Sequence, residues 1–197
     1  MIRSGPFAVA LVLAALCPAA AGAQTLPFRT GQWGAEFQSG DLTTAGVMRF
    51  FSPRSALVLD AGVLDLGLDE DDKVNSTTDE SSLSLWAARL GLRSYMPVAN
   101  RVAGFWTAGV ELARSSQKQT IPGFAGPQRI EESETHLGAF GQLGADYHVT
   151  NNLAVGMAFD VVFARVSGER TGPNTNVDLS GHRFTAAFTP VRVSLFF

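Results

Sequence analysis

Three neighbouring residues carry the side-chain types of a serine hydrolase. Ser133, Glu134 and His136 supply a hydroxyl, a carboxylate and an imidazole within four positions, and a serine nucleophile needs its base within hydrogen-bond reach. Successive side chains of an extended segment point to opposite faces, so a spacing of three separates Ser133 from His136. We therefore predict no catalytic residue, and we expect His136 and His182 at the bases of loops and His148 in a turn or inside the fold.

An acidic run offers carboxylates to a divalent cation. Asp69-Glu70-Asp71-Asp72 is followed by Asp79-Glu80. In an EF-hand loop that began at Asp69, Lys73 would occupy a ligand position and Val74 would stand where the loop requires glycine. We therefore predict neither a bound metal nor any other cofactor. The run is interpreted as a solvated loop, and a loose contact with a divalent ion stays open.

The chain begins like a secretory precursor. Arg3 precedes an apolar run from Phe7 to Leu16, and small residues follow up to Ala23, which is the pattern of a signal peptide. The apolar run is too short for a transmembrane helix, which takes about 20 residues. We predict that residues 1–23 are removed and that residues 24–197 form one domain, which lacks cysteine because Cys17 is the only one.

The charge of the chain excludes one class of partner. Its 197 residues include 15 Lys and Arg against 18 Asp and Glu. No basic patch stands out of the kind that nucleic-acid binding requires. We therefore expect no nucleic-acid partner.

Eight segments alternate apolar and polar residues with a period of two, as half-buried strands do. They lie near residues 32–40, 44–51, 56–66, 83–95, 102–113, 136–148, 153–165 and 183–197. Short connectors rich in Pro, Asn and Ser alternate with longer ones; the long polar connectors are 67–82, 114–135 and 166–182, and 40–43 takes the remaining long-loop place. Short turns that alternate with long loops are typical of outer-membrane barrels. The predicted fold is all-β, an eight-stranded antiparallel up-and-down transmembrane β-barrel.

The polar faces of these segments carry nine charged residues at mid-strand, namely Glu36, Arg49, Asp60, Arg89, Arg93, Glu111, Asp146, Asp160 and Arg192. A soluble lipocalin-like barrel would expose them, whereas a membrane barrel turns its apolar face to lipid and its polar face inward. Five acids and four bases nearly balance, as burial in a narrow lumen requires. We favour the membrane barrel.

Such a lumen is expected to be closed. Eight strands enclose a space that side chains fill, so the nine charges are predicted to form a structural network of salt bridges and no open channel. A direct test of this prediction is whether Arg89 and Arg93 meet Asp60 and Glu111 across the lumen.

The last segment, Val191 to Phe197, carries the motif of a known family. The segment alternates apolar and polar residues, its apolar set includes Val193, Leu195 and Phe197, and it ends on phenylalanine. The chain resembles the small OmpA/OmpX-type eight-stranded outer-membrane barrels. The resemblance implies a bacterial outer-membrane location after secretion, and recognition of this terminal strand by the barrel-assembly machinery. Phe184 and Phe188 have the opposite parity to Val191, which predicts a bulge near Thr189-Pro190.

These patterns favour a non-enzymatic barrel with a structural, surface-interaction or adhesion role. The expected partners are outer-membrane lipid and lipopolysaccharide, the assembly machinery, and a surface ligand held through 67–82, 114–135 and 166–182. One alternative is a narrow pore or a transporter of small apolar ligands. A second is a lipid A-modifying enzyme, because a lipid A deacylase has this fold; its histidine precedes its serine by two residues, and here the order is reversed.

Overall fold

The computed structural model describes residues 26–40, 42–72, 77–121, 128–172 and 175–197, so the predicted signal peptide at 1–23 lies outside the described residues. No helix among them is long and apolar enough to cross a membrane. The described residues form eight strands: β1 (Trp33–Ser39), β2 (Thr44–Ser52), β3 (Ser55–Asp72), β4 (Thr77–Ala99), β5 (Val102–Ile121), β6 (Gln128–His148), β7 (Leu153–Gly172) and β8 (Thr175–Phe196).

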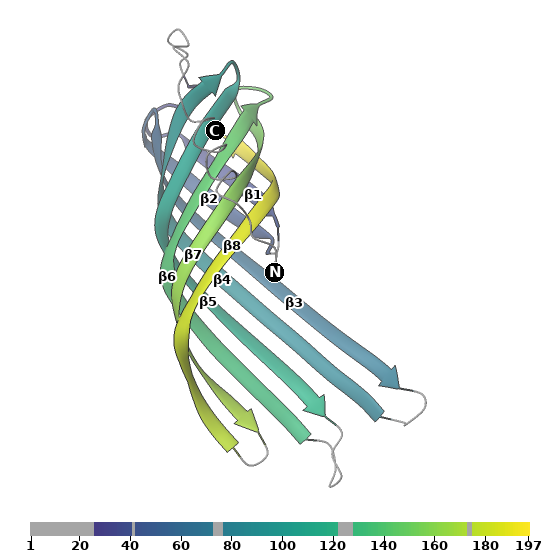
Figure 1. Ribbon diagram of the computed structural model, residues 1–197. Coiled ribbons are helices and arrows are strands. Elements are labelled where there is room, and N and C mark those ends of the chain that lie inside the picture. The colour runs from purple at the N-terminus through teal and green to yellow at the C-terminus, as the bar shows by residue number, and fades with distance from the viewer. Residues whose placement is uncertain (1–25, 41, 73–76, 122–127, 173–174) are drawn as a thin grey trace, which may run out of the picture.

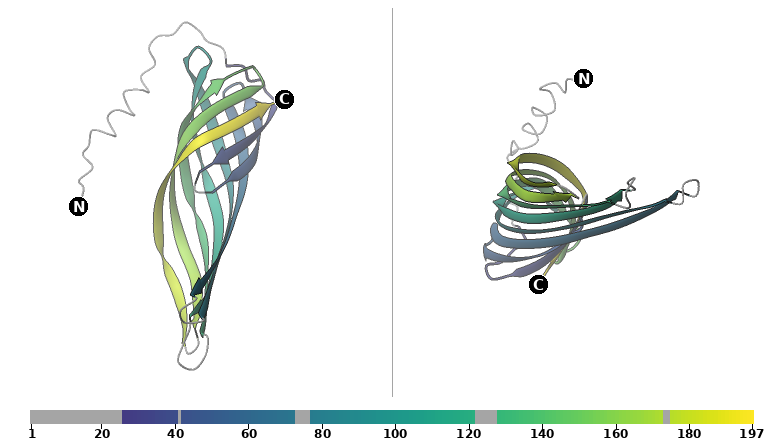
Figure 2. Two further views of the ribbon diagram at one scale, coloured as in Figure 1. Left: turned by 90° about the vertical axis from the view of Figure 1, so that its right-hand side faces the viewer. Right: turned by 90° about the horizontal axis from the view of Figure 1, so that it is seen from below.

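The strands close into a barrel in chain order, with every neighbour antiparallel (Figure 1). The ring closes where β8 pairs with β1, in a register that joins Gly34 to Phe196 and Ser39 to Val191. The predicted eight-stranded up-and-down barrel is thereby confirmed. The C-terminus lies at the short-turn end of the barrel, where this closing seam begins (Figure 2).

Three hairpins are longer than the sequence indicates. Most of the predicted loops 67–82, 114–135 and 166–182 are strand, because backbone pairing continues to Asp72 opposite Thr77, to Ile121 opposite Gln128 and to Gly172 opposite Thr175. The prediction of long loops was wrong because ladder hydrogen bonds join backbone groups, so a hairpin in register continues where apolar alternation has stopped. In Figure 1 these hairpins run well beyond the barrel.

The β1–β2 hairpin, in contrast, is short. β1 ends at Ser39 and β2 begins at Thr44. In the described pairing, β3 beyond Gly62 pairs only with β4, and β8 before Val191 pairs only with β7. The wall of the barrel is therefore lower at the β1–β2 hairpin than at the three long hairpins.

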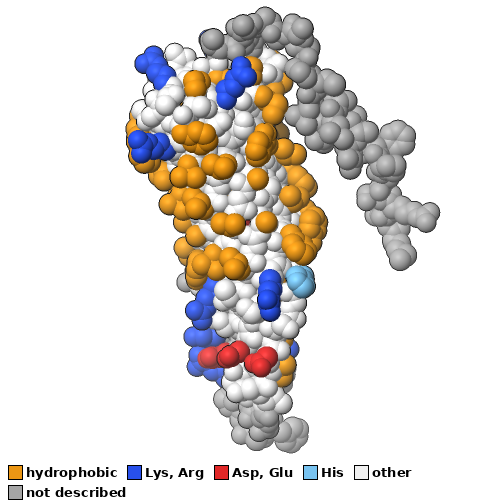
Figure 3. All heavy atoms as spheres, turned by 90° about the vertical axis from the view of Figure 1, so that its left-hand side faces the viewer, with side chains coloured by type: hydrophobic (Ala, Val, Ile, Leu, Met, Phe, Trp, Pro, Cys, Tyr) orange, Lys and Arg blue, Asp and Glu red, His pale blue; other side chains and the backbone are white. Residues whose placement is uncertain are grey.

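The outer wall is apolar. Large hydrophobic side chains at alternate positions are exposed all round the barrel, including Leu57, Leu59, Leu90, Leu92, Val110, Leu143, Met157 and Phe159. On the face drawn in Figure 3, hydrophobic side chains form a broad orange band. Trp33, Trp106, Tyr147 and Phe197 face outward near the short turns, and Trp86, Phe163 and Phe184 face outward near the long hairpins. These two levels match the aromatic girdles of a membrane barrel.

The predicted bulge in β8 is confirmed. The register between β7 and β8 shifts between Gly156 and Ala158, so that Gly156 pairs with Arg192 and Ala158 with Thr189. The extra residue changes the parity of β8 at this point. As a result Phe184 and Phe188 before the bulge, and Val191 after it, all face outward.

Candidate functional site

Eight of the nine predicted inward charges point into the lumen. Seven of them are buried, and Arg89 is partly buried. Arg49 is the exception: it is exposed, and its guanidinium lies 5.3 Å from the centre of the Trp33 ring on the outer wall. Its placement in the lumen was wrong. Arg49 shares its parity with the exposed residues Val47 and Phe51, and it sits at the short-turn interface, where cation–π contact with Trp33 accommodates the charge.

The centre of the lumen is a carboxylate shared by two arginines. Glu36 of β1 accepts hydrogen bonds from both terminal nitrogens of Arg93 on β4 and from Nη2 of Arg192 on β8. All three side chains are completely buried. Arg93 also donates from Nε to Thr107 Oγ1 at 2.8 Å. Glu36 therefore ties together strands from opposite sides of the ring.

Arg192 has a second carboxylate partner. Its Nη1 lies 2.9 Å from both Oδ1 and Oδ2 of Asp146 on β6. The guanidinium groups of Arg192 and Arg93 lie 4.2 Å and 4.8 Å from the centre of the Phe105 ring. Each buried cation thus has both a carboxylate and an aromatic face, which offset the cost of its dehydration.

A second ion-pair group lies on the long-hairpin side of the first. Arg89 of β4 pairs with Glu111 on β5 and, at 3.1 Å, with Asp160 on β7. Gln142 of β6 joins the two groups, because its Nε2 donates to Asp160 Oδ1 at 3.0 Å and its Oε1 accepts from Arg93 at 3.0 Å. The network consequently extends without interruption across the barrel.

The charges are less balanced than predicted. Without Arg49 the predicted set leaves five lumen carboxyl groups against three guanidinium groups. Of the two arginines expected to meet Asp60 and Glu111, Arg89 pairs with Glu111, whereas Arg93 pairs with Glu36. Asp60 is buried, and its Oδ1 has no hydrogen-bond partner among the described residues. The lumen is therefore acidic on balance.

A second closure lies between the network and the short turns. Phe28, which precedes β1, is only 4% exposed. Its ring centre lies 4.5 Å from that of Phe50, 4.6 Å from that of Tyr95 and 5.0 Å from that of Phe196. His148, predicted for a turn or the interior, is buried beside them at 5.4 Å. This aromatic cluster was not predicted, because no periodic pattern marks a single residue outside the strands.

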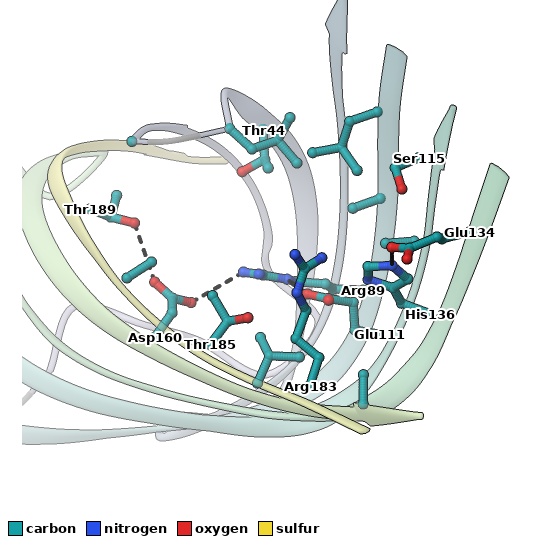
Figure 4. Close-up of a pocket in the computed structure, with 18 of the residues that line it drawn as sticks. Thr44, Arg89, Glu111, Ser115, Glu134, His136, Asp160, Arg183, Thr185 and Thr189 are labelled. Carbon is teal, nitrogen blue, oxygen red and sulfur yellow. Dashed lines mark hydrogen bonds and ion pairs between the residues drawn. The ribbon is translucent and has the colours of Figure 1, made fainter. Parts of the chain in front are cut away.

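On the opposite side of the network, the lumen widens into a cavity of about 500 Å³ (Figure 4). Arg89, Glu111 and Asp160 form its floor, and its apolar side chains are those of Leu42, Leu83, Leu85, Ala87, Ala113, Val162, Ala164 and Ala187. Arg183 of β8 and the Glu134–His136 pair lie above the floor, and His136 Nε2 is 3.1 Å from Glu134 Oε2. His136, expected at the base of a loop, is instead buried in this lining.

Ser133 and His136, the hydroxyl and the imidazole of the hydrolase-like residues, face opposite sides of β6. Ser133 faces away from the cavity, where its Oγ lies 3.3 Å from Arg114 Nη2, while Glu134 and His136 face into it. Ser115 lines the cavity opposite Glu134. In the part of the chain that the structure describes, no hydrogen bond joins a serine hydroxyl to His136. The run 69–72 and Asp79-Glu80 has no described side chains.

A closed ring with an apolar outer wall and a charged interior defines a transmembrane β-barrel. The sequence matches the family model of the outer membrane protein beta-barrel domain over residues 7–189. The chain belongs to this family, which places it in the bacterial outer membrane.

Two solved structures illustrate the likeness. One is a major outer membrane protein from Thermus thermophilus, with a TM-score of 0.59 and 12% identity over 84% of this chain and 99% of that one. The other is the outer membrane protein OprG from Pseudomonas aeruginosa, with a TM-score of 0.55 and 12% identity over 88% of this chain and 99% of that one. At these identities the likeness shows the fold alone. No curated protein matches the sequence significantly.

Proposed function

We propose that this protein is a non-enzymatic, closed outer-membrane barrel that acts at the cell surface through its long hairpins and the cavity between them. The observation that carries the proposal is the double closure of the lumen. The Glu36–Arg93–Arg192 network fills the middle, and the aromatic cluster around Phe28 fills the short-turn end. A solute would have to displace both, and the first consists of paired buried charges that are costly to separate.

Conductance across planar lipid bilayers tests the closed lumen. We expect the purified barrel to insert without producing steady ion currents, because neither closure leaves a continuous aqueous path. Folding is verified by the altered migration of the unheated barrel on a denaturing gel, and insertion by co-flotation of the barrel with vesicles of the same lipid. Steady single-channel openings from inserted protein would refute the proposal.

The cavity favours a second candidate, a transporter of small apolar ligands. Its lining is largely Leu, Ala and Val above a charged floor, and the short β1–β2 hairpin lowers the wall beside it. If the protein is a transporter, proteoliposomes would take up a small apolar solute faster than liposomes without protein. Equal uptake would leave the surface role as the better account.

We also propose that Val193, Leu195 and Phe197 form the assembly signal of the last strand. Leu195 and Phe197 face outward, and the backbone N–H of Phe197 donates to the Trp33 carbonyl at the closing seam. Phe197→Ala is expected to slow assembly in cells at least several-fold, measured as the fraction of barrel that resists protease in outer-membrane preparations. Phe184→Ala, which changes an exposed phenylalanine earlier in the same strand, is the control and should assemble normally. Equal slowing by both variants would contradict a terminal signal.

A further inference from the structure

Two arginines form a cationic row on the outer wall, directly beyond the apolar band at the long-hairpin end, and a histidine lies beside them. Arg114 of β5 is exposed opposite Trp86 of β4, and Arg165 of β7 is exposed opposite Leu137 of β6. His182 of β8 is exposed opposite Arg165. Figure 3 shows Lys or Arg side chains and a histidine where the orange band ends. In an outer-membrane barrel this level meets the boundary between acyl chains and headgroups.

These cations are available to an external anion. The hydrogen bond of Arg114 to the Ser133 hydroxyl is long, at 3.3 Å. Neither Arg114 nor Arg165 forms an ion pair with any residue that the structure describes, whereas Arg89, Arg93 and Arg192 in the lumen all do. An unpaired guanidinium at an interface binds phosphate strongly, because its planar donors match two phosphate oxygens.

A hollow with hydroxyl and carboxyl groups continues from the cationic row toward the hairpin tips. It is lined by Arg114, Ser133, Thr135, Ser167, Gly168, Glu169, Asp178 and Leu179. Glu169 and Asp178 are paired across β7 and β8, an arrangement of like charges that is unfavourable without a partner. No described ion pair involves either residue. Both carboxylates are therefore free to accept hydrogen bonds from a ligand.

We propose that this face binds the phosphorylated sugar headgroup of an outer-leaflet glycolipid. The wall presents apolar side chains, then guanidinium groups, then carboxylates, in order of distance from the membrane. In a phosphorylated glycolipid such as lipid A, the sugar carries both the acyl chains and the phosphates, so the phosphates lie at the polar edge of the acyl layer and the free sugar hydroxyls lie beside them. Phosphate oxygens accept from Arg114 and Arg165, and sugar hydroxyls donate to Glu169 and Asp178.

The spacing suits a headgroup of this size. Arg114 and Arg165 are two strands apart, and neighbouring strands are about 4.8 Å apart, so the two Cα atoms are separated by roughly 10 Å across the strands. Their long side chains can therefore reach one headgroup from both sides of β6. The site lies on the outer wall, so it is independent of whether the lumen conducts.

The test measures binding of purified lipid A to the folded full-length barrel in detergent micelles, by native mass spectrometry and by titration at two salt concentrations. The variant Arg114→Ala/Arg165→Ala is compared with Arg29→Ala/Arg54→Ala, which removes the same charge from exposed positions at the short-turn end. We expect the first pair to weaken binding at least tenfold and the second to leave it unchanged. Folding of both variants is checked by gel migration.

Two further arms identify the chemistry. Enzymatically dephosphorylated lipid A should bind the unmodified barrel at least tenfold more weakly than lipid A. Glu169→Gln/Asp178→Asn should weaken binding of lipid A several-fold and leave binding of phosphatidylglycerol unchanged. Equal weakening by both arginine pairs would overturn the proposal, since it would show general attraction to a charged micelle. Equal binding of lipid A and phosphatidylethanolamine would overturn it as well, since the sugar would then contribute nothing.

Discussion

Replacing Arg192 with methionine is expected to lower the free energy of unfolding by about 3–5 kcal/mol, because a buried carboxylate then loses its cation. Asp146, 1% exposed, receives both of its hydrogen bonds from Arg192, and Glu36 loses one of its two arginines. Methionine fills much of the same volume, so the loss reports charge rather than a cavity. Urea titration of the barrel in lipid vesicles, followed by tryptophan fluorescence, measures the change.

Arg49→Met is the matched control. It removes the same group from the outer wall, where Arg49 is exposed over Trp33, and should cost about 1 kcal/mol or less. The double variant Arg192→Met/Asp146→Leu should recover much of the stability lost by Arg192→Met, because it also removes the carboxylate that Arg192→Met leaves without a cation. If Arg192→Met were no more costly than Arg49→Met, the network would not stabilise the barrel.

Gly144→Ala, which adds one methyl group, is expected to lower the free energy of unfolding by about 3 kcal/mol, in the upper part of the range for overpacked interiors. A Cβ at this position of β6 would lie 2.3 Å from the Phe105 ring and 2.5 Å from the Met157 carbonyl oxygen. The ring is held between Tyr95 and two guanidinium groups, and the carbonyl belongs to the neighbouring strand, so neither can move freely. The same urea titration of Gly144→Ala measures the loss.

Gly141→Ala provides the comparison on the same strand. A Cβ there meets only Val161 Cγ2, at 3.4 Å, and alanine reduces the freedom of the unfolded chain. We expect this variant to be as stable as the unmodified barrel or slightly more stable. Equal losses from the two variants would mean that glycine itself, rather than the room it leaves for Phe105, matters in β6.

The barrel could be predicted from the sequence because lipid imposes a period of two on every spanning segment. Even the bulge near Pro190 follows from the parity of Phe188 and Val191. The lengths of the hairpins could not be predicted, because beyond the membrane the backbone pairs without requiring apolar residues. Arg49 was misplaced in the lumen, although it shares its parity with the exposed residues Val47 and Phe51, so the alternation in β2 itself indicates the outer wall.

Eight of the nine residues predicted for the lumen point inward, but the pairs that they form could be foreseen only in part. Alternation identifies which charges point inward. The ion pair of Arg89 with Glu111 also follows from the sequence, because the two residues are direct neighbours across β4 and β5. Arg93 with Glu36 joins strands that are not neighbours. Which residues meet across a lumen depends on the stagger of the strands, and that stagger is a property of the closed ring rather than of any one segment.

Phe28 has a consequence for the time course of assembly. Its seat is built from Phe50 on β2, Tyr95 on β4 and Phe196 on β8, so the complete seat exists only after the last strand has met the first. Docking of the N-terminal segment is therefore a late event, and a protease site placed before Phe28 should be cut in stalled intermediates more readily than in finished barrels. Burial of Phe28 thereby reports that β8 has closed the barrel against β1.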